Sequence, residues 1–128
     1  MVISRIKEQL QEYPQVTYTS SEGVLEVPAQ NPTGFRVWIR ERRGHYTAGF
    51  KGWHEEFPHA DSALKCFAFG LSSACRLRVF RCLGTDYKWQ VLVSVDGEWV
   101  ADSETGLLFP TFLLPKKQRD LHNDIIAA

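Results

Sequence analysis

Residues 52–71 read GWHEEFPHADSALKCFAFGL, and this stretch says most about the fold. Leu64, Phe67 and Leu71 recur with the spacing of one helical face, and Asp61 stands where a helix N-cap is expected. The stretch therefore predicts a buried central helix that follows an acidic loop with two histidines.

Upstream of this helix the sequence predicts one helix and two β-hairpins. Residues 2–13 repeat apolar side chains every three or four positions and stop at Pro14, which is typical of an amphipathic helix. Residues 15–29 contain two short alternating runs around the turn at 20–23, and residues 35–50 alternate on both sides of an Arg-Arg-Gly turn. Each of these two segments is expected to form a hairpin.

Downstream of the central helix the pattern changes to strands. Residues 75–83, 87–95 and 98–100 predict a three-strand meander, with an Asp-Gly turn before its last strand. Residues 107–115 are apolar but interrupted by a proline, so we expect an extended arm across the sheet. A last amphipathic helix is expected from about residue 115 onward.

The whole chain, 1–128, is therefore predicted to be a single α+β domain. Its antiparallel sheet consists of two hairpins and a three-strand meander, covered by N-terminal, central and C-terminal helices. The order helix, strands, helix, strands, helix resembles the plan of type III secretion chaperones and their relatives. This resemblance implies a protein that binds other proteins and often dimerises.

Composition narrows the functional classes. Fifteen Lys and Arg balance fifteen Asp and Glu, so overall charge favours neither nucleic acid nor an acidic substrate. The three cysteines are odd in number and form no CxxC pair, which favours reduced thiols in a cytoplasmic protein. No phosphate-binding glycine loop, GxSxG or HExxH motif occurs. We therefore expect no cofactor and lean against an enzyme.

One cluster nevertheless suggests chemistry. His54, Glu55, Glu56 and His59 include metal-ligand types and a possible general base, so a metal-dependent or hydrolytic enzyme is the alternative hypothesis. The spacing matches no known helical metal motif, and acidic residues near a helix N-terminus are also explained by its dipole. Among the thiols only Cys82 is predicted to share a face with arginines and to merit a reactivity test.

Two strands carry rows of arginine with interleaved aromatic side chains. If the rows share a sheet face, they form a platform for the acidic groups of a protein partner, or for stacked bases of single-stranded nucleic acid. An ordinary solvated sheet face is the competing interpretation. The predicted contact residues are Arg36, Trp38, Arg40, Arg76 and Arg78.

The apolar arm offers a second possible contact. Phe109 and Phe112 either close the core or, if exposed, anchor an interface with a partner or with a second copy in a homodimer. Our leading hypothesis is a small non-enzymatic protein-binding module, such as an adaptor, a chaperone-like factor or a toxin-neutralising protein.

Overall fold

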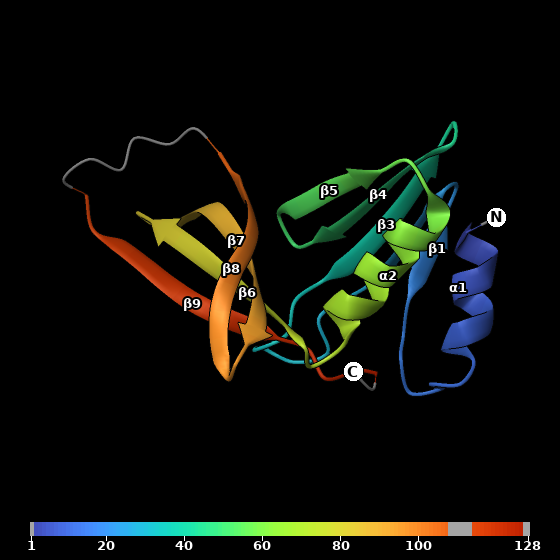
Figure 1. The fold of residues 1–128 in the computed structure, drawn as a ribbon, viewed down its shortest axis with the longest axis horizontal. Coiled ribbons are helices and arrows are strands. Elements are labelled where there is room, and N and C mark those ends of the chain that lie inside the picture. The colour runs from blue at the N-terminus through green and yellow to red at the C-terminus, as the bar shows by residue number, and fades with distance from the viewer. Residues whose placement is uncertain (1, 108–113, 127–128) are drawn as a thin grey trace.

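The computed structural model describes residues 2–107 and 114–126. These residues form two helices and two neighbouring antiparallel sheets (Figure 1). The helices are α1 (Val2–Leu10) and α2 (Ala60–Leu71). The first sheet contains, in spatial order, β1 (Thr19–Ser21), β2 (Val24–Val27), β3 (Val37–Arg42), β4 (His45–Phe50) and β5 (Trp53–Phe57). The second contains β8 (Glu98–Gly106), β7 (Thr85–Val95), β6 (Cys75–Cys82) and β9 (Lys116–His122).

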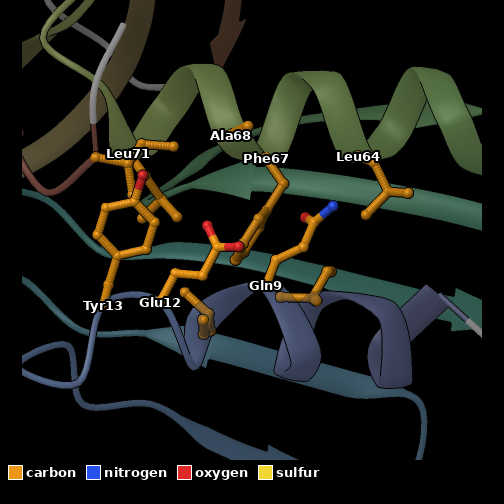
Figure 2. Close-up of a pocket in the computed structure, with 10 residues that line it drawn as sticks. Gln9, Glu12, Tyr13, Leu64, Phe67, Ala68 and Leu71 are labelled. Carbon is orange, nitrogen blue, oxygen red and sulfur yellow. The ribbon is translucent and has the colours of Figure 1, made fainter.

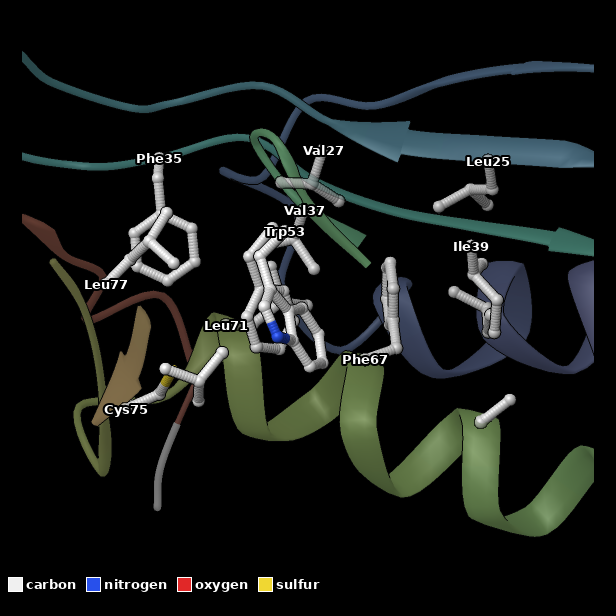
Figure 3. Close-up of a cluster of buried hydrophobic side chains, with 14 of the residues drawn as sticks. Leu25, Val27, Phe35, Val37, Ile39, Trp53, Phe67, Leu71, Cys75 and Leu77 are labelled. Atoms are coloured by element: carbon white, nitrogen blue, oxygen red, sulfur yellow. The ribbon is translucent and has the colours of Figure 1, made fainter. Parts of the chain in front are cut away.

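One face of the first sheet, here called the inner face, is apolar and packs against both helices (Figure 1). Leu25, Ile39 and Ala48 are paired across β2, β3 and β4, and all three are fully buried. Phe67 and Leu71 of α2 point toward these strands (Figure 3). Burying each such large apolar side chain contributes about 1.5–3 kcal/mol. The inner face is therefore the main hydrophobic core.

Tight turns explain how neighbouring strands pair. The two-residue turns Arg43-Gly44, Leu83-Gly84 and Asp96-Gly97 have positive φ at both positions, for example 51° and 77° in the first. This is the geometry of a type I′ turn, whose twist matches that of the flanking strands. A glycine at the second position adopts it without the steric cost of a Cβ.

The turn between β4 and β5 connects the two sheets. A Cβ on Gly52 would lie only 2.3 Å from the Trp89 ring, so the turn packs tightly on β7. Lys51 Nζ lies 3.2 Å from Asp86 Oδ2, and Arg81 Nε lies 2.8 Å from Asp86 Oδ1. Burial alone would raise the pKa of Asp86, but hydrogen bonds from Arg81 and Lys51 outweigh it and hold that pKa below its usual value.

A buried asparagine makes a second connection. Asn123, which follows β9, is 3% exposed. Its Oδ1 accepts a hydrogen bond from the Phe35 N–H at 3.1 Å, and its Nδ2 donates to the carbonyls of Phe35 at 3.1 Å and Gly70 at 2.9 Å. One side chain thus joins the C-terminal segment, the end of α2 and the entry to β3.

Much of the expected order is confirmed. The N-terminal helix, the central helix, both predicted hairpins and the three-strand meander are present, and the fold is α+β. The single sheet is wrong, because β6 pairs with β7 and β9 and not with the first sheet. The stretch 53–57, expected as a loop, is β5. Asp61 is not the N-cap: His59 holds that position, and Asp61 lies 3.4 Å from Arg5.

The expected C-terminal helix is also wrong in the described residues. Residues 116–122 form β9, which pairs along β6 and places Leu121 opposite Leu77. Leu121 and Ile125 have helical spacing, but pairing with β6 satisfies the backbone and buries Leu121 at 4% exposure. The element order therefore no longer matches the plan that resembled type III secretion chaperones.

Candidate functional site

The opposite face of the first sheet, here called the outer face, is polar. Strand alternation places Trp38 and Arg40 of β3 beside Gly49 and Thr47 of β4, while Glu56 of β5 follows Thr47 in the same row. Both helices pack on the inner face, so no helix of the described residues covers this one (Figure 1). The outer face is therefore a sheet surface that the helices leave open to a partner.

Trp38 is held flat against this face. A Cβ on Gly49 would lie 2.0 Å from the Trp38 ring, so only glycine leaves room for the indole. Trp38 Nε1 donates to the Lys51 carbonyl at 3.4 Å, and the Arg40 guanidinium lies 5.8 Å from the ring centroid. Such a distance allows a cation–π attraction worth about 0.5–1 kcal/mol at an exposed site. The pair forms an ordered cationic and aromatic patch.

A pocket of about 320 Å³ opens beside this patch, at the turn between β3 and β4. We call it the turn pocket. Arg40 and Thr47 face each other across β3 and β4, and Arg42 faces His45 one pair further on. Thr47 is 5% exposed, although its neighbours in the pocket reach solvent. The lining residues are Arg40, Arg42, Arg43, His45, Thr47 and Glu56.

The arginines of the turn pocket are electrostatically unpaired. The described residues form five ion pairs, and none includes Arg40, Arg42 or Arg43. In contrast, Arg36, at the far end of the same row, lies 3.4 Å from Glu26. The positive charge of the outer face is therefore concentrated at the turn pocket.

The second predicted arginine row lies elsewhere. Arg76 and Arg78 belong to β6, so the two rows do not share a sheet. The Arg76 guanidinium lies 4.2 Å from the Trp99 ring centroid. Arg78 donates to both carboxylate oxygens of Asp120, at 2.8 and 3.1 Å, and these hydrogen bonds are the main reason that the pKa of Arg78 is raised. The groups of this row thus have local partners.

The structure does not bring the histidine cluster together as a site. His54 and Glu56 project from the outer side of β5, Glu55 alternates to the other side, and His59 precedes α2. Across residues 2–107 and 114–126, no group of three His, Cys, Asp or Glu side chains is placed to hold a metal. The arrangement of these four residues therefore gives no support to a metal site or a hydrolytic site. Phe109 and Phe112, the predicted anchors in the apolar arm, lie outside the described residues.

The thiols are poorly suited to nucleophilic chemistry. Burial, with smaller contributions from the carboxylates of Glu55 and Asp102, raises the pKa of Cys66 to about 12. Burial, together with the neighbouring Cys66, raises that of Cys75 to about 12 as well. Cys82, the thiol predicted to lie among arginines, is fully buried. A nucleophilic cysteine needs a lowered pKa and an accessible sulfur, and Cys66 and Cys75 lack the first while Cys82 lacks the second.

A groove of about 260 Å³ lies between α1 and α2 (Figure 2). Leu64, Phe67 and Leu71 line it from α2, while Glu12 and Tyr13 stand on the opposite side. Its lining is mainly apolar, with one carboxylate, so it offers no set of groups for acid–base or metal chemistry.

In comparisons with known proteins, no protein-family model, curated protein or solved structure matches the chain. Neither α1 nor α2, the helices of the described residues, has the length and apolarity needed to cross a membrane.

The sequence identified only part of this site. Trp38 and Arg40 were predicted, whereas Arg42, Arg43, His45, Thr47 and Glu56 join them only through strand register. One signal was available, because a two-residue turn at Arg43-Gly44 forces Arg42 to face His45 and Arg40 to face Thr47.

Proposed function

We propose that this chain is a non-enzymatic module that binds an acidic protein partner through the outer face of its first sheet. The observation that carries the proposal is the group of three unpaired guanidinium groups at the turn pocket, next to the fixed indole of Trp38. Arginine and tryptophan are enriched where proteins recognise one another. Charge complementarity at such a surface speeds association and selects the partner.

Several features favour a protein over other partners. The net charge of the chain is zero, which weakens long-range attraction to nucleic acid. The aromatic content of the patch is one indole, whereas single-strand binding surfaces stack successive bases on several rings. We propose contacts from Trp38, Arg40, Arg42 and Arg43, with Arg36 at the margin because Glu26 compensates its charge. A cytoplasmic location and a homodimer remain predictions.

Capture from source-cell lysate with matched variants tests this function. The test variant carries Arg40→Glu, Arg42→Glu and Arg43→Glu, and the control carries Arg76→Glu and Arg78→Glu on the second sheet. We expect an acidic protein that binds the wild type and the control but not the test variant, and whose purified form cross-links near Trp38. Binding should weaken as salt rises, because the contact is electrostatic.

Three results would contradict the proposal. Equal loss of the partner from both variants would point to general charge effects, and cross-links confined to the second sheet would place the interface there. Nucleic acid as the captured species would favour the single-strand alternative. Circular dichroism of each variant must first show a folded protein.

A further inference from the structure

Resting on the proposed function, we infer that the turn pocket receives a phosphate monoester carried by a phosphorylated side chain of the protein partner. The argument starts from the pocket floor. Thr47 is 5% exposed, and its hydroxyl has no hydrogen-bond partner among the described residues. Because Thr47 lines the pocket, its hydroxyl is free to donate a hydrogen bond to an oxygen-rich ligand seated there.

The walls supply charge of the opposite sign. Arg40, Arg42 and Arg43 contribute three positive charges, and Glu56 contributes the one carboxylate of the lining. The lining therefore carries an excess of two positive charges when His45 is neutral. Directly opposed strand residues hold their Cβ atoms about 4.5–5.5 Å apart, so Arg40 and Thr47 stand close enough to contact one small group.

Phosphate fits this set of donors better than a carboxylate does. A phosphate monoester carries a charge of about −1.5 to −2 and three strong acceptor oxygens. The guanidinium group presents parallel N–H donors that bind two such oxygens at once. A carboxylate has two oxygens and a single charge, so it would leave part of the excess charge uncompensated.

Glu56 has a defined role in this arrangement. Glu56 is paired with Thr47 across β4 and β5, and Thr47 is paired with Arg40 across β3 and β4. Glu56 therefore lies on the side of Thr47 opposite Arg40. Its negative charge repels a phosphate dianion. It can also accept hydrogen bonds from the guanidinium groups or from backbone N–H groups of a bound peptide. Replacing it with glutamine should therefore tighten the binding of free phosphate esters, a result that a purely structural role would not give.

The probes are phosphoserine and phosphotyrosine with their backbone amino and carboxyl groups blocked. Glutamate blocked in the same way is the carboxylate probe, and AMP is a phosphate ester that does not come from a protein. Binding is followed by backbone amide chemical shifts at Thr47 and by calorimetry at constant ionic strength. We expect both phosphoamino acids to bind at least about tenfold more tightly than blocked glutamate, as the difference in charge implies.

The variants are Thr47→Val, Thr47→Ser and Glu56→Gln. Thr47→Val should weaken phosphoserine binding about tenfold, the value of one hydrogen bond to a charged group. Thr47→Ser keeps the hydroxyl and should bind like the wild type, while Glu56→Gln should bind more tightly.

The outcomes separate this inference from the proposed function. Equal binding of glutamate and phosphoserine, or an unchanged affinity in Thr47→Val, overturns the phosphate inference. Tighter binding of AMP than of both phosphoamino acids overturns the protein source. If phosphate esters fail to bind while the triple arginine variant still loses its acidic partner, the proposed function stands without the phosphate.

Discussion

The ionic connection between the two sheets gives the sharpest test of the fold. Replacing Asp86 with asparagine keeps the shape of the side chain but removes its charge. The carboxylate accepts one hydrogen bond from Arg81 at 2.8 Å and one from Lys51 at 3.2 Å, and its side chain is 13% exposed. Hydrogen bonds to charged groups contribute about 1.5–3 kcal/mol each, and less where the partner reaches solvent. The side chains of Arg81 and Lys51 are 46% and 32% exposed, so we expect Asp86→Asn to lose about 2 kcal/mol of unfolding free energy.

The pH dependence of this loss has a definite sign. The folded-state pKa of Asp86 lies below its usual value, since the hydrogen bonds from Arg81 and Lys51 outweigh the effect of burial. A carboxyl group of this kind stabilises the fold above its unfolded pKa of about 3.9, and the contribution disappears as the pH falls through the folded pKa. The difference between wild type and Asp86→Asn should therefore be constant from about pH 5 to 8 and shrink below about pH 4.

Urea unfolding across this pH range measures the effect, with Asp120→Asn as the matched control. Asp120 binds one arginine, Arg78, through both oxygens, but its side chain is 32% exposed and Arg78 is in the same sheet, whereas Asp86 also pairs with Lys51 from the turn after β4. Because Asp120 is more exposed than Asp86, we expect Asp120→Asn to lose less stability than Asp86→Asn. The reasoning is refuted if the two variants lose the same stability at pH 7, or if the Asp86→Asn difference stays constant in acid.

The other predictions concern the buried Asn123 side chain, Gly49 and the thiols. Asn123→Ala leaves three buried backbone groups without partners and should cost about 3–5 kcal/mol, measured by thermal unfolding; a loss under 1 kcal/mol would show that these groups find other partners. Gly49→Ala should displace Trp38 from the outer face and change its fluorescence with little loss of secondary structure, and an unchanged emission spectrum would contradict the close approach. Cys66 and Cys75 should react with a thiol reagent at pH 8 far more slowly in the native than in the unfolded protein, because burial raises their pKa values to about 12; equally fast reaction of the native protein would contradict this.

Local patterns were sufficient for most secondary structure. Ile3, Ile6 and Leu10 repeat with a helical period and are buried in α1. Phe67 and Leu71 do the same in α2. Asp-Gly and Arg-Gly turns fix hairpins because two-residue turns leave few alternatives for the strands on either side. These features depend on neighbours in sequence, which is why the sequence alone predicts them.

Features set by distant partners escaped prediction. Residues 116–122 pair with β6, more than thirty positions earlier, and nothing within the segment itself signals that pairing. Five consecutive polar residues, 116–120, fit an exposed edge strand as well as a helix, and charged side chains are common on such edges. The turn pocket was missed for the same reason, because its residues meet only through the pairing of β3, β4 and β5.

The contrast between paired and unpaired arginines is the strongest reason to place a binding site at the turn pocket. The chain has as many acidic as basic residues, so a shortage of carboxylates does not explain why Arg40, Arg42 and Arg43 lack ion pairs. Like charges held close together repel one another, and the repulsion is largest when water is displaced. Elsewhere Arg78 and Arg81 each lie 2.8 Å from a carboxylate oxygen. A fold that compensates those arginines but leaves three together beside the unpartnered Thr47 hydroxyl leaves room for negative charge from outside the chain.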